Sequence, residues 1–208
     1  TISVSTWLQT TQDQFDQGVR PGFRATSSDS VVVSDEVGEY GTAVATSGEW
    51  TTVNTLREYI EPIVVTSVRY NRTTENQRTS RVRNKDTASF ELLVDNYDGT
   101  HTGTTTVDYV VMEAGDWTLE DGAGGTRVVA GSELVSTVEA NSLSSTINGT
   151  TVSFSPSFSG TPAVMTAITS NNDSTWVISS THDGSNKNNT PTASTLGLFL
   201  NRIFESAV

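Results

Sequence analysis

The chain of 208 residues contains no cysteine, so it has neither a disulfide framework nor thiol chemistry. It has only two histidines, His101 and His182, which lie in turn-like segments and are expected at the surface. Without cysteine or a close histidine pair we expect no zinc site, and without a nucleophile-elbow motif no serine–histidine–acid triad. No apolar run approaches 18 residues, so no membrane insertion is expected. These absences favour a protein that is not an enzyme.

Lysine is also scarce, since two lysines stand against ten arginines, and the formal net charge is −12. An acidic surface repels nucleic acid and anionic lipid, so no nucleic-acid partner is expected. Few lysines with many carboxylates and threonines resemble the composition of proteins from salt-loving archaea and their viruses. In molar salt the Debye length is about 3 Å, so acidic self-repulsion costs little there. An ordinary acidic extracellular protein is the alternative.

Serine and threonine are abundant, with 60 residues in all, while hydrophobic residues make up 34% of the chain. Threonine is stiff at its first side-chain torsion and suits a pleated sheet. Apolar and polar residues alternate with a period of two between Asp-Gly and Asn-Gly turns. The pattern predicts an all-β protein, with one or two turns of helix only at residues 9–18. Strands are expected at residues 31–33, 63–70, 80–85, 90–97, 107–113, 126–130, 152–158, 164–168, 176–179 and 196–203.

The chain also repeats itself, because three segments of its first half recur in the same order in the second half. The matching pairs are residues 51–53 and 150–152, residues 62–68 and 162–168, and residues 90–94 and 196–200. Self-similarity of this kind predicts an array built from one small unit. We therefore expect two tandem antiparallel β-sandwich modules.

The expected organisation has four parts: a strand-bearing N-terminal segment (1–49), module 1 (50–120), a glycine-rich linker with a connecting strand (121–146) and module 2 (147–208). An apolar strand at residues 106–115 closes the first repeat, and nothing after the strand expected at residues 196–203 plays that part in the second. The second module is therefore expected to be one strand short. Either the chain continues, or a neighbouring chain or the N-terminal segment supplies the strand.

The core-strand pattern is similar to H-type-lectin-like β-sandwich modules, which recur in surface proteins of bacteria, archaea and their viruses. The pattern is a proline-led strand, then Phe-x-Leu-x-Val, then a closing Tyr-x-x-x-Glu-x-Gly. It is carried in the first repeat by Pro62, Val64, Val68, Phe90, Leu92, Val94, Tyr109, Glu113 and Gly115, and in the second by Pro162, Val164, Ile168, Leu196, Leu198 and Leu200. The resemblance covers roughly residues 50–117 and 147–208. It implies a β-sandwich, and lectins of this family bind N-acetylgalactosamine-type sugars at subunit seams. The tryptophan-rich segment near that sugar site has no match here.

Two acidic loop segments are candidates for calcium, because hard cations prefer closely spaced oxygen ligands. Asp95 and Asp98 lie in one segment and Asp173 in the other. Aspartate before glycine is also the usual residue of a tight hairpin, because it tolerates left-handed backbone. Calcium is the one possible cofactor that the sequence offers.

Three cations, Arg81, Arg83 and Lys85, alternate and would share one face of a strand. They could bind phosphate or an acidic glycan, or they could form a cross-strand charge ladder with Glu91 and Asp95, which we prefer.

The tryptophans, chief among them Trp176, could serve as sugar platforms. We expect each of them in a core or an interface instead. Trp176 is nevertheless kept as a candidate ligand-binding residue.

Taken together, the pattern predicts a non-enzymatic structural or attachment component of an external surface. A virion surface, turret or tail-fibre protein of a halophilic host is the first interpretation. We expect a homo-oligomer among neighbouring structural proteins, with a host-surface glycan as a possible ligand. The alternatives are a cell-surface adhesin or lectin module and an accessory domain of a secreted glycoside hydrolase.

Overall fold

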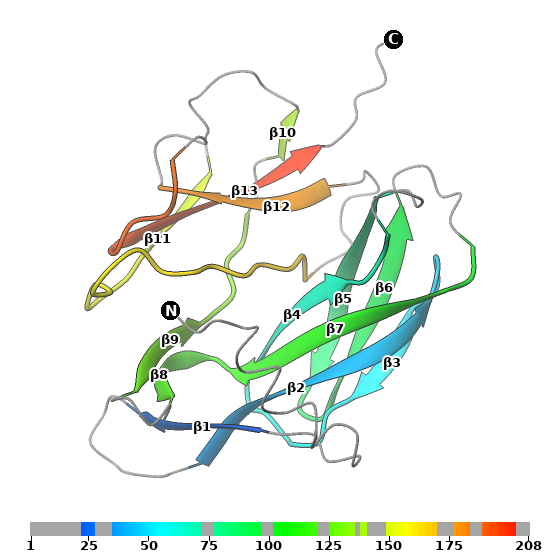
Figure 1. The fold of residues 1–208 in the computed structure, drawn as a ribbon, viewed down its shortest axis with the longest axis horizontal. Coiled ribbons are helices and arrows are strands. Elements are labelled where there is room, and N and C mark those ends of the chain that lie inside the picture. The colour runs from blue at the N-terminus through cyan, green and yellow to red at the C-terminus, as the bar shows by residue number, and fades with distance from the viewer. Residues whose placement is uncertain are drawn as a thin grey trace.

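A computed structural model describes residues 22–27, 35–71, 77–96, 102–119, 125–135, 138–140, 149–169, 177–183 and 189–202. These residues form thirteen strands in three sheets and no helix, which confirms the all-β prediction (Figure 1). Within this part of the chain no helix is long and apolar enough to cross a membrane. The helix predicted at residues 9–18 and the strand at 31–33 lie outside the described residues.

The largest sheet has six strands, and every neighbouring pair in it is antiparallel. Its order is β4 (Pro62–Val68), β7 (Thr104–Glu113), β2 (Asp35–Thr46), β1 (Gly22–Ser27), β8 (Gly115–Leu119) and β9 (Thr126–Ala130). β7 lies between β4 and β2, so both of its edges are paired. β1 and β2, from the predicted N-terminal segment, are interior strands of this sheet. β8 and β9, which flank the glycine-rich stretch, pair with one another.

A second sheet, of three strands, faces the β4–β7–β2 part of the first. Its order is β3 (Thr51–Asn54), β6 (Ser89–Asn96) and β5 (Arg78–Asp86). Alternate residues of β6 point inward, and the Phe90 ring packs edge-to-face on Tyr109 of β7 with the centroids 5.3 Å apart. The buried cluster between the sheets comprises Ala45, Val53, Tyr59, Val64, Val82, Phe90, Leu92, Val94, Val107, Tyr109 and Val111. Among the described residues this is the larger of the two buried apolar clusters, and removing such side chains from water stabilises the fold.

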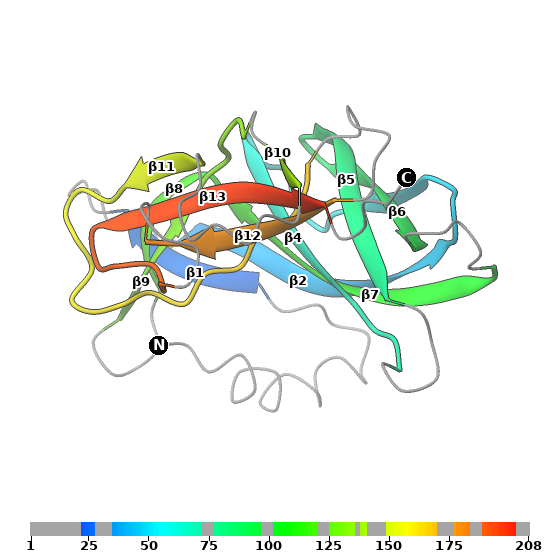
Figure 2. The same cartoon turned by 90° about the horizontal axis from the view of Figure 1, so that it is seen from above.

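The third sheet is built around β13 (Thr195–Arg202). β12 (Val177–His182) pairs with one edge of β13 along its length. On the other edge, β11 (Thr150–Ser153) pairs with the first half and β10 (Val138–Ala140) with the second. Only β10 runs parallel to β13. Figure 1 places this sheet above β8 and β9, and Figure 2 shows β12 and β13 running side by side.

The third sheet reproduces the second, which shows that the sequence repeat is also a structural repeat. β11, β13 and β12 take the places of β3, β6 and β5 in the same register. Thr51 pairs with Leu92 as Thr150 pairs with Leu198, and Ser80 pairs with Val94 as Ser179 pairs with Leu200.

The loops of the two repeats are held by the same backbone hydrogen bonds. In the first repeat the Thr55 and Tyr59 N–H groups donate to the carbonyls of Ala88 and Thr87, at 2.9 and 2.7 Å. In the second repeat the corresponding N–H groups, of Phe154 and Phe158, donate to Ser194 and Ala193, both at 2.8 Å. Because Phe154 begins this turn, the strand predicted at 152–158 ends early, at Ser153.

Two predictions in the second repeat are wrong. Residues 164–168 were expected to form a strand, but only Ile168 makes a bridge, to Arg81 of β5. No described strand stands where β7 stands beside β4, so the segment has no ladder to join. His182 was expected at the surface, yet β12 extends to this residue and its side chain is 1% exposed.

A smaller core lies under the β8 end of the large sheet, where Trp117 packs against a cluster of Val37, Met112 and Leu119. The indole Nε1 of Trp117 donates to the Glu113 carbonyl at 3.0 Å. A core role for this tryptophan agrees with the prediction.

A carboxylate is buried beside the main core, because Glu39 of β2 is 0% exposed. Its Oε2 accepts hydrogen bonds from the Leu56 backbone N–H at 2.8 Å and from the Tyr59 hydroxyl at 3.3 Å. Burial raises the pKa of Tyr59 well above its ordinary value, and the charge of Glu39 raises it further.

Alkaline pH is expected to destabilise the protein partly through Tyr59. Because its pKa is raised in the folded state, its contribution is fully present below about pH 10, where the unfolded chain ionises, and is lost as the pH rises from there towards the folded value. Tyr59→Phe should therefore lose less stability than the wild type between pH 8 and pH 11. Urea unfolding at both pH values measures this, with Tyr70→Phe as the control. Equal losses in the wild type and Tyr59→Phe would contradict it.

Candidate functional site

The two repeats meet at a seam, which is the best candidate site in the described part of the chain. On one side of the seam the Val82 N–H of β5 donates to the Ile168 carbonyl at 2.9 Å. On the other side, Arg127 of β9 forms an ion pair with Asp116 of β8, with Nε 2.8 Å from Oδ1. The same guanidinium donates to the Pro156 carbonyl at 2.6 Å and stacks on the Phe158 ring, 4.5 Å from its centroid.

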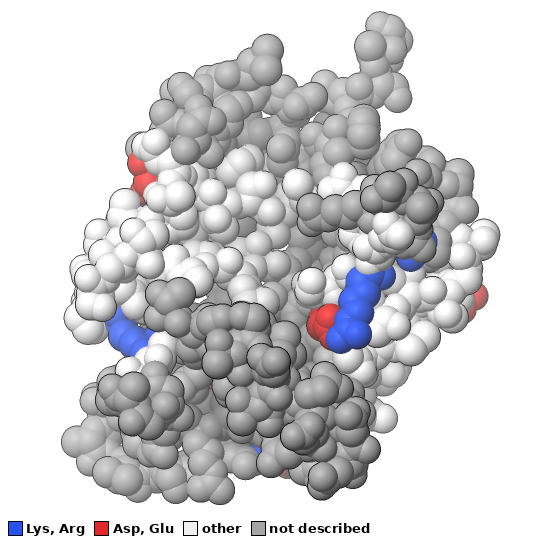
Figure 3. All heavy atoms as spheres, in the orientation of Figure 1, with Lys and Arg blue, Asp and Glu red and all other residues white. Residues whose placement is uncertain are grey.

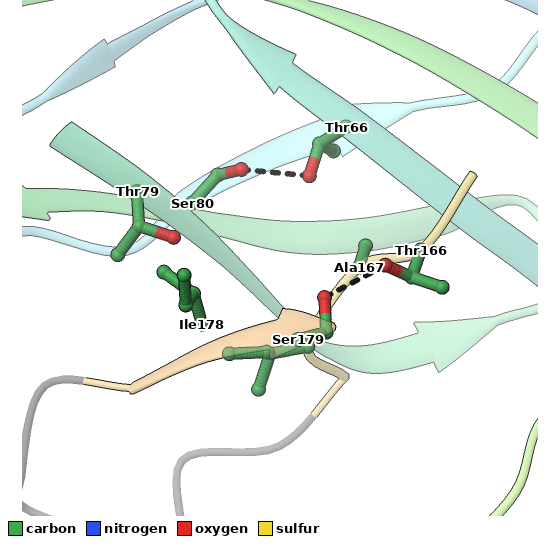
Figure 4. A pocket seen from close by; sticks show the side chains of 8 residues that line it. Thr66, Thr79, Ser80, Thr166, Ala167, Ile178 and Ser179 are labelled. Carbon is green, nitrogen blue, oxygen red and sulfur yellow. Dashed lines mark hydrogen bonds between the residues drawn. The ribbon is translucent and has the colours of Figure 1, made fainter. Parts of the chain in front are cut away.

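A cleft of about 200 Å³ opens where β4 and β5 approach the second repeat (Figure 4). Its walls carry hydroxyl and aliphatic side chains: Thr66, Thr79, Ser80, Thr166, Ala167, Ile168, Ile178 and Ser179. No charged or aromatic residue is among them. A cleft of this composition can hydrogen-bond water or a neutral polar group, but it offers no acid, base or ion-pairing group.

The same hydrogen-bonded hydroxyl pair occurs in the cleft once from each repeat. The Oγ1 of Thr66 in β4 lies 2.8 Å from the Oγ of Ser80 in β5, and the Oγ1 of Thr166 also lies 2.8 Å from the Oγ of Ser179. Figure 4 shows the two pairs on opposite sides of the cleft. The side chain of Thr166 therefore sits over β12 as Thr66 sits over β5. The segment 162–168 thus occupies the place of β4 without being a paired strand.

The backbone of this segment is open. In the first repeat β4 pairs with β7 along its whole length, from Pro62 opposite Glu113 to Val68 opposite Val107. In the second repeat the backbone N–H and C=O groups of residues 161–167 make no hydrogen bond within the described part of the chain. The side chain of Met165 is 53% exposed. The segment is an unpaired edge of extended chain, which is a template for strand addition.

The apolar side chains under this edge are also incompletely covered. Leu92 and Val94 of β6 are fully buried, whereas their counterparts Leu198 and Leu200 of β13 are only half-buried. The same contrast separates Val53, Tyr59 and Val64 in the first repeat from Val152, Phe158 and Val164 in the second. Within the described residues, the second repeat therefore leaves its inner apolar side chains less covered than the first repeat does.

The predicted charge ladder is present as one ion pair. Arg83 of β5 lies opposite Glu91 of β6, with Nε 2.7 Å from Oε2, and its guanidinium stacks over Trp50 at 3.9 Å. On the face in Figure 3, charged side chains lie in small groups separated by uncharged surface, with no broad basic patch among the described residues.

The other two cations do not join this ladder. Arg81 is buried, at 7% exposure, and lies opposite Leu93. Lys85 follows a shift of register at Asn84, which has a φ of 45°, and burial lowers the pKa of Lys85 while Glu61 opposes this. The sequence could not reveal this bulge. The alternation of the three cations therefore predicted wrongly that all three side chains join one charge ladder.

The described residues do not test the calcium prediction. Asp95 accepts a hydrogen bond from the Asn96 N–H at 2.8 Å and lies opposite Thr79. Asp98, Asp173 and Trp176 lie outside the described residues. In the part of the chain that the structure describes, no three acidic, histidine or cysteine side chains gather to hold a metal. Calcium binding stays a prediction.

A buried histidine, missed by sequence reasoning, takes the place of the ion pair in the second repeat. His182 corresponds to Arg83, and Gly197 opposite it corresponds to Glu91. A Cβ at Gly197 would lie 2.4 Å from Cε1 of His182, so glycine makes room for the ring. The ring also packs on Phe199, with centroids 5.5 Å apart. The glycine in the middle of an apolar strand was the available signal.

Comparison with known proteins finds no matching family model, no matching curated protein and no matching solved structure. The resemblance to H-type-lectin-like modules therefore rests on the core-strand residues alone. The geometry of the seam is thus the main guide to function.

Proposed function

We propose that the protein is a non-enzymatic structural or attachment component of an external surface. The observation that carries this proposal is the unpaired extended segment at residues 161–167, which leaves the second repeat half-covered. A folded unit with an open edge and partly exposed core side chains is suited to assembly, because a neighbouring chain can pair with the edge and cover them. On this proposal the chain is two tandem β-sandwich modules, the second of which is completed in the assembly.

The composition supports a particular setting. A net charge of −12, two lysines, no cysteine and many threonines suit an extracellular particle in concentrated salt. A virion surface, turret or tail-fibre protein of a halophilic host is the form of this proposal that we favour. Its partners are further copies of the chain and neighbouring structural proteins.

Glycan binding by a cell-surface adhesin or lectin module is the second candidate, and the cleft at the seam favours it. Five hydroxyl groups line that cleft, and hydroxyls can exchange hydrogen bonds with a sugar. A glycan array probed with the wild type and with Ser179→Ala tests this candidate. Binding that falls in the variant would support a sugar site in the cleft, and no binding by the wild type would remove it.

The native mass in high and low salt, measured by light scattering, tests the favoured proposal. A defined oligomer that forms in molar salt and dissociates in dilute buffer is the expected result, because screening removes the repulsion between acidic subunits. A monomer that is indifferent to salt and to protein concentration would overturn it.

A further inference from the structure

We infer that residues 162–168 accept, in antiparallel orientation, an extended strand from a different protein of the assembly, with β-branched or aromatic residues at three alternate positions. This inference deepens the proposed function and rests on it, because it names the chemistry of the partner. The partner is defined by what β7 supplies to β4 in the first repeat.

The repeat fixes the register of the incoming strand. In the first repeat Val64, Thr66 and Val68 of β4 lie opposite Val111, Tyr109 and Val107 of β7. Their counterparts in the second repeat are Val164, Thr166 and Ile168. The hydroxyl pair of Thr166 and Ser179, which matches that of Thr66 and Ser80, shows that the two segments are seated alike. The incoming strand therefore places its three apolar residues opposite those three positions.

The side chains of the incoming strand would pack on the apolar inner face of β13. Val107, Tyr109 and Val111 are at most 2% exposed, because they pack on the inner face of β6. The matching inner face of β13 carries Leu198 and Leu200, which are half-buried. Covering such side chains contributes about 25 cal/mol for each Å² of apolar surface removed from water. Backbone pairing with residues 163–167 would add main-chain hydrogen bonds.

The proline at the start of the edge does not prevent this pairing. Pro62 occupies the same position as the first residue of β4, where it lies opposite Glu113, the last residue of β7. Proline is tolerated at the first residue of a strand, where a missing N–H costs little.

The occupant is not β7 itself, whether of this chain or of a second copy. β7 is paired on both edges, with β4 and β2, so it cannot also serve the second repeat.

One outward position of the incoming strand should differ from β7 in its charge. Asp108 of β7 forms an ion pair with Arg69, whose Nε lies 2.7 Å from Oδ2, and the counterpart of Arg69 is Thr169. An acidic residue is thus not required there. A neutral or basic residue suits the acidic chain better.

A labelled synthetic peptide with the sequence of residues 104–113 is the probe. Its binding to the full chain is measured by fluorescence anisotropy, with a peptide of the same composition but broken alternation as the control. Saturable binding of the β7 peptide, and at least about tenfold weaker binding of the control, is the expected result. Equal binding of the two peptides, or none of either, would overturn the inference.

Two substitutions at neighbouring positions test whether the peptide binds at this edge. Val164→Asp puts a carboxylate on the half-buried face that the peptide would cover, and it should weaken binding by about tenfold or more. Met165→Asp, on the exposed face of the same segment, should change binding by less than about threefold. Circular dichroism of both variants checks that they fold. Equal losses in the two variants would contradict the inference.

The proposed function can fail separately. If the peptide binds this edge but the chain stays monomeric in all salts, the strand acceptor stands and self-assembly falls. If the chain assembles in salt and Val164→Asp dissolves the oligomer while no peptide binds, the edge pairs with a second copy and the inference of a different partner is overturned.

Discussion

Leu92→Ala is expected to lower the free energy of unfolding by about 2 to 5 kcal/mol, and Leu198→Ala by about 1 to 2 kcal/mol. The two leucines occupy the same place in the two repeats, opposite Thr51 and Thr150. Leu92 is 0% exposed between two sheets, so its removal leaves a cavity. Leu198 is half-buried on an unfinished layer, so its removal leaves a shallower gap that water can enter.

Equilibrium urea unfolding followed by circular dichroism measures both costs in one buffer. Because the substitution and its position in the repeat are the same, the difference reports how completely each repeat is covered. Binding of the partner strand should raise the cost of Leu198→Ala towards that of Leu92→Ala. If Leu198→Ala were as costly as Leu92→Ala in the isolated monomer, the second repeat would be complete and the open edge would be wrong.

Glu39→Ala is expected to lower the free energy of unfolding by about 2 to 4 kcal/mol. The carboxylate is fully buried and accepts hydrogen bonds from the Leu56 N–H and the Tyr59 hydroxyl. Removing it takes away the acceptor of a backbone donor and opens a space beside the core. A buried polar group left without a partner costs more than a lost surface contact.

Glu91→Ala is the matched control, because Glu91 also forms a charged contact but lies at the surface. Its ion pair with Arg83 is partly exposed, so its loss should cost less than about 1 kcal/mol. Both variants are measured by urea unfolding at pH 8. A cost for Glu39→Ala no larger than that for Glu91→Ala would show that the buried carboxylate does not stabilise this corner of the core.

Sequence reasoning succeeded where one face of a strand is buried and the other is not. β6, β7 and β13 were predicted from alternation, and β9 was predicted with its observed bounds. The repeat was visible because the same residues face the same cores in both halves. β2, which is 12 residues long and has β1 on one edge and β7 on the other, was missed because Gly38, Glu39 and Gly41 interrupt its apolar pattern. The structure shows why the glycine at 41 is needed: a Cβ there would lie 2.5 Å from the Tyr109 hydroxyl.

The failed strand at residues 164–168 is instructive for a different reason. Its alternation is that of β4, but a strand also needs a partner, and the pattern of one segment does not say whether a partner is present. Residues 164–168 form no ladder among the described residues because no described strand lies beside them as β7 lies beside β4. The second repeat was predicted to lack this same closing strand.

The seam between the repeats could not be predicted. Val82 and Ile168, like Arg127 and Phe158, come together through the packing of distant segments, which a local pattern does not encode.

Hydrogen exchange of the backbone amides in residues 63–68 and 163–167, followed in the isolated chain and in the same chain saturated with the peptide of residues 104–113, tests the open edge most directly. Amides paired in a ladder exchange only when the structure opens, whereas unpaired amides exchange freely. Residues 63–68 should be protected in both samples, because β7 covers them. Residues 163–167 should exchange rapidly in the isolated chain and become protected when the peptide binds. Equal protection of the two segments in the isolated chain, or no gain in protection at 163–167 on peptide binding, would contradict the account.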